Sequence, residues 1–251
     1  MSPSLARCIA RAVATVLGIV VGTCALAPAL AKKSDESRKP GGAELAFRWD
    51  PAEGGPKTVA QTLEVLGAPQ KTPERYRVTY LKVEHFPELA GFCSILRQRT
   101  RVDKGEYQIT FKFRGDSPLP ARTAAGEWTC PVGQTGASKD EVDVTVLADR
   151  EVRKYSRSCT VEANAAPPLP ASFGATLERH ESTMLRAKAN GSVVEEWHLP
   201  DGSVTVEVSA KGPGDAQQVA SFRKRVVDRL TAAGARPSAG NKSESSAYCP
   251  K

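Results

Sequence analysis

Basic side chains recur at every second position along two stretches of the sequence. Arg97, Arg99 and Arg101 belong to the segment ILRQRTR, and Lys112 and Arg114 lie near the end of the segment GEYQITFKFRG. Residues two apart in a β-strand point to the same side, so each segment would present a row of positive charges. Guanidinium and ammonium groups arranged in this way can bind the oxygen atoms of phosphate-rich anions.

Carboxylates occupy comparable positions on other segments. Glu44 and Glu207 share strand faces with the basic residues Arg48 and Lys211. Carboxylate oxygens are the ligands that hard divalent cations prefer. The pattern therefore fits a site for an anion and a metal ion, but a charged strand face more often lies simply in contact with water. The four acidic candidates are Glu44, Glu141, Asp143 and Glu207.

Strands must position these side chains, and alternating apolar and polar residues predict eight of them. Ile109, Phe111 and Phe113, for example, alternate with the polar residues of GEYQITFKFRG. Apolar residues at helical spacing predict a short helix at 58–66 and a longer one at 216–233. The eight strands are expected at 44–50, 74–83, 95–102, 107–114, 141–147, 151–161, 192–198 and 203–211.

Many strands and few helices favour a mainly β fold, built as one antiparallel sheet or barrel. Two arrangements of a barrel are open at this point. In the commoner one, the apolar faces fill the interior and the charges contact water. In the inverse one, the charges line a tunnel and helices pack on the apolar outside. Composition and alternation do not choose between them.

The first 31 residues have the pattern of an export signal. Arg7 and Arg11 precede an apolar run at 12–25, which is short for a membrane span, and Ala29-Leu30-Ala31 fits cleavage after Ala31. The signal carries two arginines and no acidic residue, so its removal lowers the net charge from +7 to +5. This modest basic excess is compatible with an anionic ligand and decides nothing alone.

Export makes a periplasmic or secreted location the expectation, with no transmembrane segment in the mature chain. Lipid attachment at Cys24 is the less favoured alternative, because Thr23 fits that motif poorly. Residues 32–42 are expected to form a disordered leader and residues 43–251 a single domain. Nucleic acid is not an expected partner, because the basic faces lack interleaved aromatic residues.

Four cysteines follow the predicted signal, and an even number in an exported chain indicates two disulfides. Three pairings are possible, and the preferred one joins Cys130 to Cys159 and Cys93 to Cys249.

The order of these segments resembles the CYTH, or triphosphate tunnel metalloenzyme, superfamily, which includes thiamine triphosphatases, inorganic triphosphatases and class IV adenylate cyclases. Its members carry ExExK on the first strand, then LRxR, a TxK strand, E-x-E strands and a closing KSKY-like segment. The corresponding stretches here are ELAFR, LRQR, ITFK, EVD and NKSESSAY, which together span roughly residues 43–248.

This resemblance implies a closed, antiparallel, eight-stranded barrel whose charged faces line a tunnel, with a few helices packed outside. It also implies metal-dependent hydrolysis of a triphosphate or polyphosphate, with Mg²⁺ or Mn²⁺ as the cofactor and a phosphate-rich small anion as the partner. The implied phosphate ligands are Arg97, Arg99, Lys112, Arg114, Lys211 and Lys242, the metal-side carboxylates are Glu44, Glu141, Asp143 and Glu207, and the catalytic residues are Glu44, Arg48 and Lys112.

Two positions depart from the family pattern on its acidic side. Ala46 and Ser209 stand where the motifs have carboxylates, whereas the basic positions are better preserved. Losing carboxylates weakens the binding of the divalent cation that hydrolysis needs. The alternative to a triphosphatase is therefore a catalytically weakened barrel of the cell envelope that binds an anion or a partner. The sequence leaves the substrate, the oligomeric state and the presence of enzyme activity open.

Overall fold

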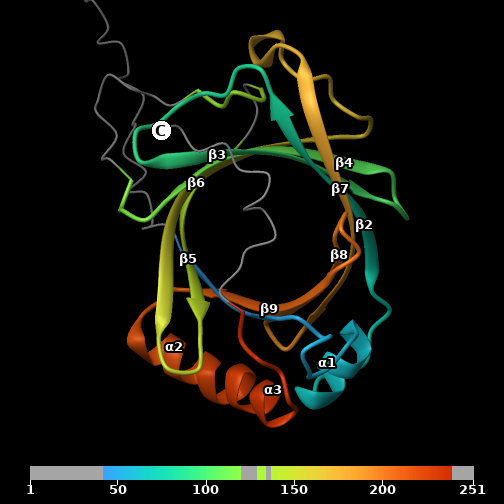
Figure 1. The fold of residues 1–251 in the computed structure, drawn as a ribbon, viewed down its shortest axis with the longest axis vertical. Coiled ribbons are helices and arrows are strands. Elements are labelled where there is room, and N and C mark those ends of the chain that lie inside the picture. Colours follow the sequence, from blue (N-terminus) through green and yellow to red (C-terminus); the bar gives the residue numbers. More distant parts are fainter. Residues whose placement is uncertain (1–41, 120–128, 134–136, 239–251) are drawn as a thin grey trace, which may run out of the picture. The chain divides into compact units, whose positions relative to one another are not determined.

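The computed structural model describes residues 42–119, 129–133 and 137–238. Nine strands close into a barrel in the order β1-β5-β6-β4-β3-β2-β7-β8-β9, with β9 returning to β1 (Figure 1). The strands are β1 (Ala43–Trp49), β2 (Glu74–Val83), β3 (Phe92–Arg101), β4 (Glu106–Gly115), β5 (Ala137–Val146), β6 (Glu151–Ala163), β7 (Thr176–Ala189), β8 (Ser192–His198) and β9 (Val204–Gly212).

The prediction of eight strands is wrong, because it lacks β7. The segment TLERHESTMLRAKA has charged residues on both of its faces, so it gives no clear alternation. Its first part pairs only with β2, from Thr176 to Ser182, and is largely exposed. Backbone pairing on a long β2–β7 ribbon, more than apolar burial, forms this part of the strand, and such pairing leaves little trace in the side chains.

The expectation of a wholly antiparallel barrel also needs correction. β1 runs parallel to β5, whereas every other pair of neighbouring strands in the described barrel is antiparallel. β1 thus pairs with β9 on one side and with β5 on the other, and these two pairings close the barrel.

The helices pack on the outside of the barrel, as the inverse arrangement requires. On β1, Leu45, Phe47 and Trp49 are fully buried in an apolar cluster that also contains residues of α1 (Val59–Val65) and of the C-terminal helix. In Figure 1 these helices lie beside β8 and β9, outside the ring of strands. The C-terminal helix is continuous and consists of α2 (Ala216–Phe222), a π-helical segment (Arg223–Val227) and α3 (Asp228–Ala232).

The C-terminal helix begins with a side-chain cap. Asp215 has an extended backbone, and its Oδ1 accepts a hydrogen bond of 2.8 Å from the backbone N–H of Gln218. We expect Asp215→Ala to lower the free energy of unfolding by about 1 kcal/mol, because it leaves an N–H of the first turn unsatisfied. Urea unfolding measures the change, and Asp215→Asn, which keeps the acceptor, should match the wild type to within experimental error.

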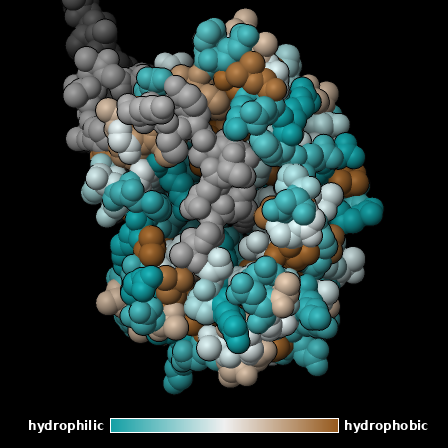
Figure 2. Space-filling view, viewed as in Figure 1, coloured by the Kyte–Doolittle hydropathy of each residue, from teal (hydrophilic) through white to brown (hydrophobic). Residues whose placement is uncertain are grey.

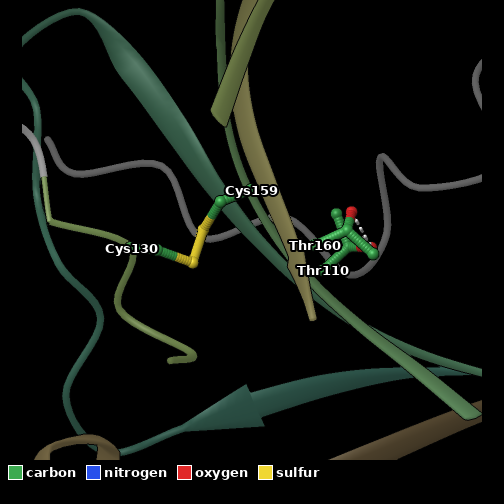
Figure 3. Close-up of a disulfide and its surroundings, with 4 residues drawn as sticks. All are labelled: Thr110, Cys130, Cys159 and Thr160. Atoms are coloured by element: carbon green, nitrogen blue, oxygen red, sulfur yellow. Dashed lines mark hydrogen bonds between the residues drawn. A yellow bond between two sulfur atoms is a disulfide. The ribbon is translucent and has the colours of Figure 1, made fainter. Parts of the chain in front are cut away.

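A second apolar cluster lies on the outer face of β2, β3, β4 and β6. Phe111 and Cys159 belong to it, and the disulfide between Cys130 and Cys159 ties residues 129–133 to that face. Figure 3 shows this disulfide on one side of the strands and a pair of hydrogen-bonded threonines, Thr110 and Thr160, on the other. The predicted Cys130–Cys159 pair is confirmed. Cys93 is also disulfide-bonded, and Cys249, predicted to be its partner, lies outside the described residues.

The interior is not charged throughout. A third cluster lies on the same strand faces as the charged residues, and two of its members, Tyr80 and Ile95, also line the central cavity. Met184 and Trp197 of this cluster are completely buried. The barrel therefore has a charged section and an apolar section along its interior. The cluster consists of Tyr76, Val78, Tyr80, Ile95, Met184 and Trp197.

The predicted signal at 1–31 and residues 32–41 of the leader lie outside the described residues, as does Lys242. In the part of the chain that is described, no helix has the length and apolar character needed to cross a membrane.

Candidate functional site

A cavity of about 240 Å³ inside the barrel brings together every predicted site residue that the structure describes. Side chains from β1, β3, β4, β5 and β9 reach it, because alternation turns their charged faces inward. Its lining has eight basic and five acidic side chains, so its formal charge is positive. The ten predicted residues are Glu44, Arg48, Arg97, Arg99, Lys112, Arg114, Glu141, Asp143, Glu207 and Lys211.

Strand register arranges some of these side chains in rows across the wall. Arg97 of β3 is paired with Thr110 of β4, which is paired in turn with Thr160 of β6. Next to this row, Lys112 is paired with Ser158 of β6. Cations and hydroxyl groups therefore lie beside one another on neighbouring strands, and both kinds of group can donate hydrogen bonds to the oxygens of an anion.

Arg97 and Arg99 lie in the charged section and have no carboxylate partner in the described part of the chain. The Nε atom of each is buried and has no hydrogen-bond acceptor, and among the described residues neither forms an ion pair. The guanidinium of Arg99 lies 5.3 Å from the centroid of the Tyr76 ring, in a cation–π contact. Burial, followed by the charge of Arg97, lowers the pKa of Arg99 to about 10, so the side chain remains charged at neutral pH.

Asp143 is surrounded by cations. Its Oδ2 accepts a hydrogen bond of 3.3 Å from Nζ of Lys112 and lies 3.4 Å from Nε of Arg114. Burial alone would raise the pKa of Asp143, but the charges of Lys112 and Arg114 outweigh this effect, and the pKa is lowered. The carboxylate is therefore ionised at neutral pH and matched by two positive charges.

Glu141 has a similar environment on the same strand. Its Oε1 lies 2.8 Å from Nζ of Lys139 and 3.1 Å from Nζ of Lys211. Burial would raise the pKa of Glu141, but the hydrogen bond and charge of Lys139, together with the charge of Lys211, lower it overall. Partial desolvation lowers the pKa of Lys139, whereas the charges of Glu141 and Glu44 outweigh the same effect at Lys211 and raise its pKa.

Arg48 and Glu207 bind each other. Nε of Arg48 donates to Oε2 of Glu207, Nη1 donates to Oγ1 of Thr145 at 2.9 Å, and both charged side chains are almost fully buried. Burial opposes the charge on Arg48, but the charge and hydrogen bond of Glu207 raise its pKa overall. Glu207 is thus held by Arg48 and is not part of the group formed by the other three predicted carboxylates.

Those three carboxylates match a divalent cation in donor type and spacing. Glu44, Glu141 and Asp143 each offer an oxygen, and these oxygens lie within 4.8 Å of one another. Mg²⁺ and Mn²⁺ take such ligands. The surrounding charge does not match, because Asp143 and Glu141 are each already in contact with two cationic side chains. The residues present therefore do not fit a resident metal ion.

Sequence reasoning missed several side chains that line the cavity. Arg186 lies on β7, the strand that was not predicted, and forms an ion pair of 3.2 Å with Glu195 of β8. Glu195 lies on a predicted strand and also accepts a hydrogen bond from Nε1 of Trp197. Because Glu195 is two residues from Trp197, the two share a strand face, and this spacing could have identified Glu195 as a residue next to the interior. Lys139 precedes the predicted start of its strand by two residues.

Fold and site together define a closed nine-stranded β-barrel with helices outside and a charged cavity inside. Hydrophilic residues make up much of the surface around the barrel when it is viewed down its bore (Figure 2). No protein-family model matches the sequence, and no curated protein matches it either.

Solved structures resemble the chain at low sequence identity. The PH1012 protein from Pyrococcus horikoshii has a TM-score of 0.44 and 15% identity, over 76% of this chain and 90% of its own. A conserved hypothetical protein from Pyrococcus furiosus has a TM-score of 0.38 and 13% identity, over 74% and 91%. A candidate adenylate cyclase from Vibrio parahaemolyticus has a TM-score of 0.40 and 10% identity, over 84% and 95%. Likeness at this level transfers no activity to the chain.

Proposed function

We propose that this protein binds a small, phosphate-rich anion inside its barrel. The observation that carries the proposal is the pair Arg97 and Arg99, two neighbouring cations on β3 whose buried Nε groups lack acceptors among the described residues. Burying like charges side by side is unfavourable, and a bound polyanion would offset this by supplying the missing acceptors. The two side chains would grip phosphate oxygens, while Lys112 and Lys211 add positive charge.

The size of the cavity supports a small ligand. Its volume of about 240 Å³ lies below the roughly 300–1,000 Å³ of pockets that hold drug-sized molecules. Hydroxyl groups of Ser158 and Thr160 on the lining add uncharged donors beside the cations. A short inorganic polyphosphate such as tripolyphosphate has the charge and the dense oxygen atoms that this lining would recognise.

Calorimetric titration of the purified protein with tripolyphosphate, in buffer containing EDTA, tests the proposal. We expect saturable 1:1 binding with a micromolar dissociation constant, and much weaker binding of monophosphate, which reaches fewer of the cations. Binding should weaken steeply as salt is added, because the interaction is ionic. A titration that shows no saturable binding, with or without a divalent cation present, would remove the proposed function.

A second candidate is hydrolysis of a triphosphate or polyphosphate assisted by Mg²⁺ or Mn²⁺. The observation that favours it is the close approach of the oxygens of Glu44, Glu141 and Asp143. Because these residues do not fit a resident metal ion, the cation would have to arrive together with the substrate. Release of phosphate from tripolyphosphate, measured in the presence of each cation and of EDTA, distinguishes an enzyme from a binding protein. Release that depends on the cation and is lost in Glu44→Gln would establish the second candidate.

We place this function outside the cytoplasm, in the periplasm or in the secreted fraction. The Cys130–Cys159 disulfide supports this location, because structural disulfides persist in oxidising compartments. Fractionation of cells that produce the full chain, with detection of the protein and determination of its N-terminal residue, tests both the compartment and cleavage after Ala31.

A further inference from the structure

The part of the cavity around Glu141 and Asp143 contains more positive than negative side chains. Asp143 contacts Lys112 and Arg114 at 3.3 and 3.4 Å. Glu141 contacts Lys139 and Lys211 at 2.8 and 3.1 Å. Four cations therefore surround two anions. Even with Glu44 included, the charge of this group is positive before any ligand arrives.

Such a group repels a dication. A unit charge at 4 Å interacts with another by about 4 kcal/mol at the effective dielectric constant of a protein surface, and a dication doubles this energy. A divalent ion at Glu141 and Asp143 would lie next to ammonium and guanidinium groups that already contact one oxygen of each carboxylate, and it would compete with them. If the dication took over Asp143, Lys112 and Arg114 would lose that partner while remaining mostly buried, which is unfavourable.

We infer that Lys112, Arg114, Lys139 and Lys211 take the place of a divalent cation, so that the cavity accepts the polyphosphate as the metal-free anion. This inference rests on the proposed function and adds the chemical form of the ligand to it. The four side chains supply positive charge to the phosphate oxygens directly. Glu141 and Asp143 hold these side chains in place and moderate the positive charge of the cavity.

The two carboxylates have different roles here and in a site where a metal ion bridges the protein and the anion, and this difference can be tested. In a metal-bridged site, Glu141 and Asp143 bind the cation, so neutralising either of them weakens binding of the anion. In the arrangement inferred here, neutralising either one removes a charge that attracts two cations and repels the anion. Asp143→Asn and Glu141→Gln, which keep the shape of each side chain, should therefore each tighten the binding of tripolyphosphate in EDTA by about tenfold.

Glu181→Gln provides a matched control. Glu181 is an exposed carboxylate on β7, paired with Arg77 at 3.5 Å, and it does not line the cavity. Its neutralisation should leave the dissociation constant within about twofold of wild type, since exposed charges are well screened. Circular dichroism of each variant establishes that it is folded. The two cavity variants are independent, so the failure of one to fold leaves the other as the test.

Titration of the unaltered protein with Mn²⁺ alone needs no variant. We expect no saturable binding at dissociation constants below about 1 mM, and unchanged affinity for tripolyphosphate at equal free ligand when EDTA replaces Mg²⁺. Weaker anion binding in Asp143→Asn and Glu141→Gln, or micromolar binding of Mn²⁺, would overturn the inference. Binding of tripolyphosphate only with Mg²⁺ would overturn it too while leaving the proposed function intact, whereas no binding under either condition would end the proposed function itself.

Discussion

Arg99→Gln is expected to weaken tripolyphosphate binding by about 10- to 100-fold and at the same time to stabilise the protein. The loss of affinity follows from removing charge-assisted hydrogen bonds, each worth about 1.5–3 kcal/mol. The gain in stability follows from removing a largely desolvated charge that is repelled by Arg97 and whose buried Nε has no acceptor among the described residues. We expect about 1–2 kcal/mol, after the loss of the cation–π contact with Tyr76 is subtracted.

Calorimetry gives the affinity and urea unfolding gives the stability of the same variant. Arg97→Gln should lose affinity similarly, and Arg99→Lys, which keeps the charge but not the planar fork, should retain part of the binding. Arg77→Gln is the control, because Arg77 is an exposed arginine on β2 that does not line the cavity. If Arg99→Gln instead destabilised the protein and bound the anion as tightly as wild type, Arg99 would be a structural residue.

The sequence pattern identified several residues of the site, but it did not show whether their side chains point into the barrel. Arg97 and Lys112 were found because β-strand alternation fixes which residues share a face, and basic residues recur two apart on both of their faces. Alternation cannot say whether that face points inward. The inward choice is made by tertiary packing, as α1 and the C-terminal helix cover the apolar faces of β1 and β9. Only the resemblance in motif order pointed to this arrangement before the structure did.

Two physical causes explain the features that sequence analysis missed. β7 is held in large part by backbone pairing with β2, so its side chains follow no simple pattern, and Arg186 was missed with it. The apolar interior cluster was missed because Tyr76 and Val78 alternate like any residues of a core-facing strand. Their inward direction follows from the sidedness of the whole barrel, which no single strand contains.

Glu207→Leu is expected to be strongly destabilising, by about 3–5 kcal/mol. The substitution leaves the guanidinium of Arg48 buried without its partner, since among the described residues only Thr145 remains as a hydrogen-bond acceptor. Breaking a buried ion pair in this way costs far more than the pair contributes as a whole, because the remaining charge keeps its desolvation penalty. Urea unfolding monitored by tryptophan fluorescence measures the change.

The double variant Arg48→Met/Glu207→Leu distinguishes two effects on the free energy of unfolding: that of leaving Arg48 buried without a partner and that of removing the whole ion pair. Replacing both members with apolar side chains of similar volume should recover most of the lost stability, as both charges have then left the interior. The exposed pair Arg75–Asp103, with side chains 63% and 47% accessible, supplies the contrast. Asp103→Asn should change stability by less than about 0.5 kcal/mol. A double variant as unstable as Glu207→Leu would mean that the introduced leucine side chain, and not the unpaired Arg48, disrupts the packing between β9 and β1.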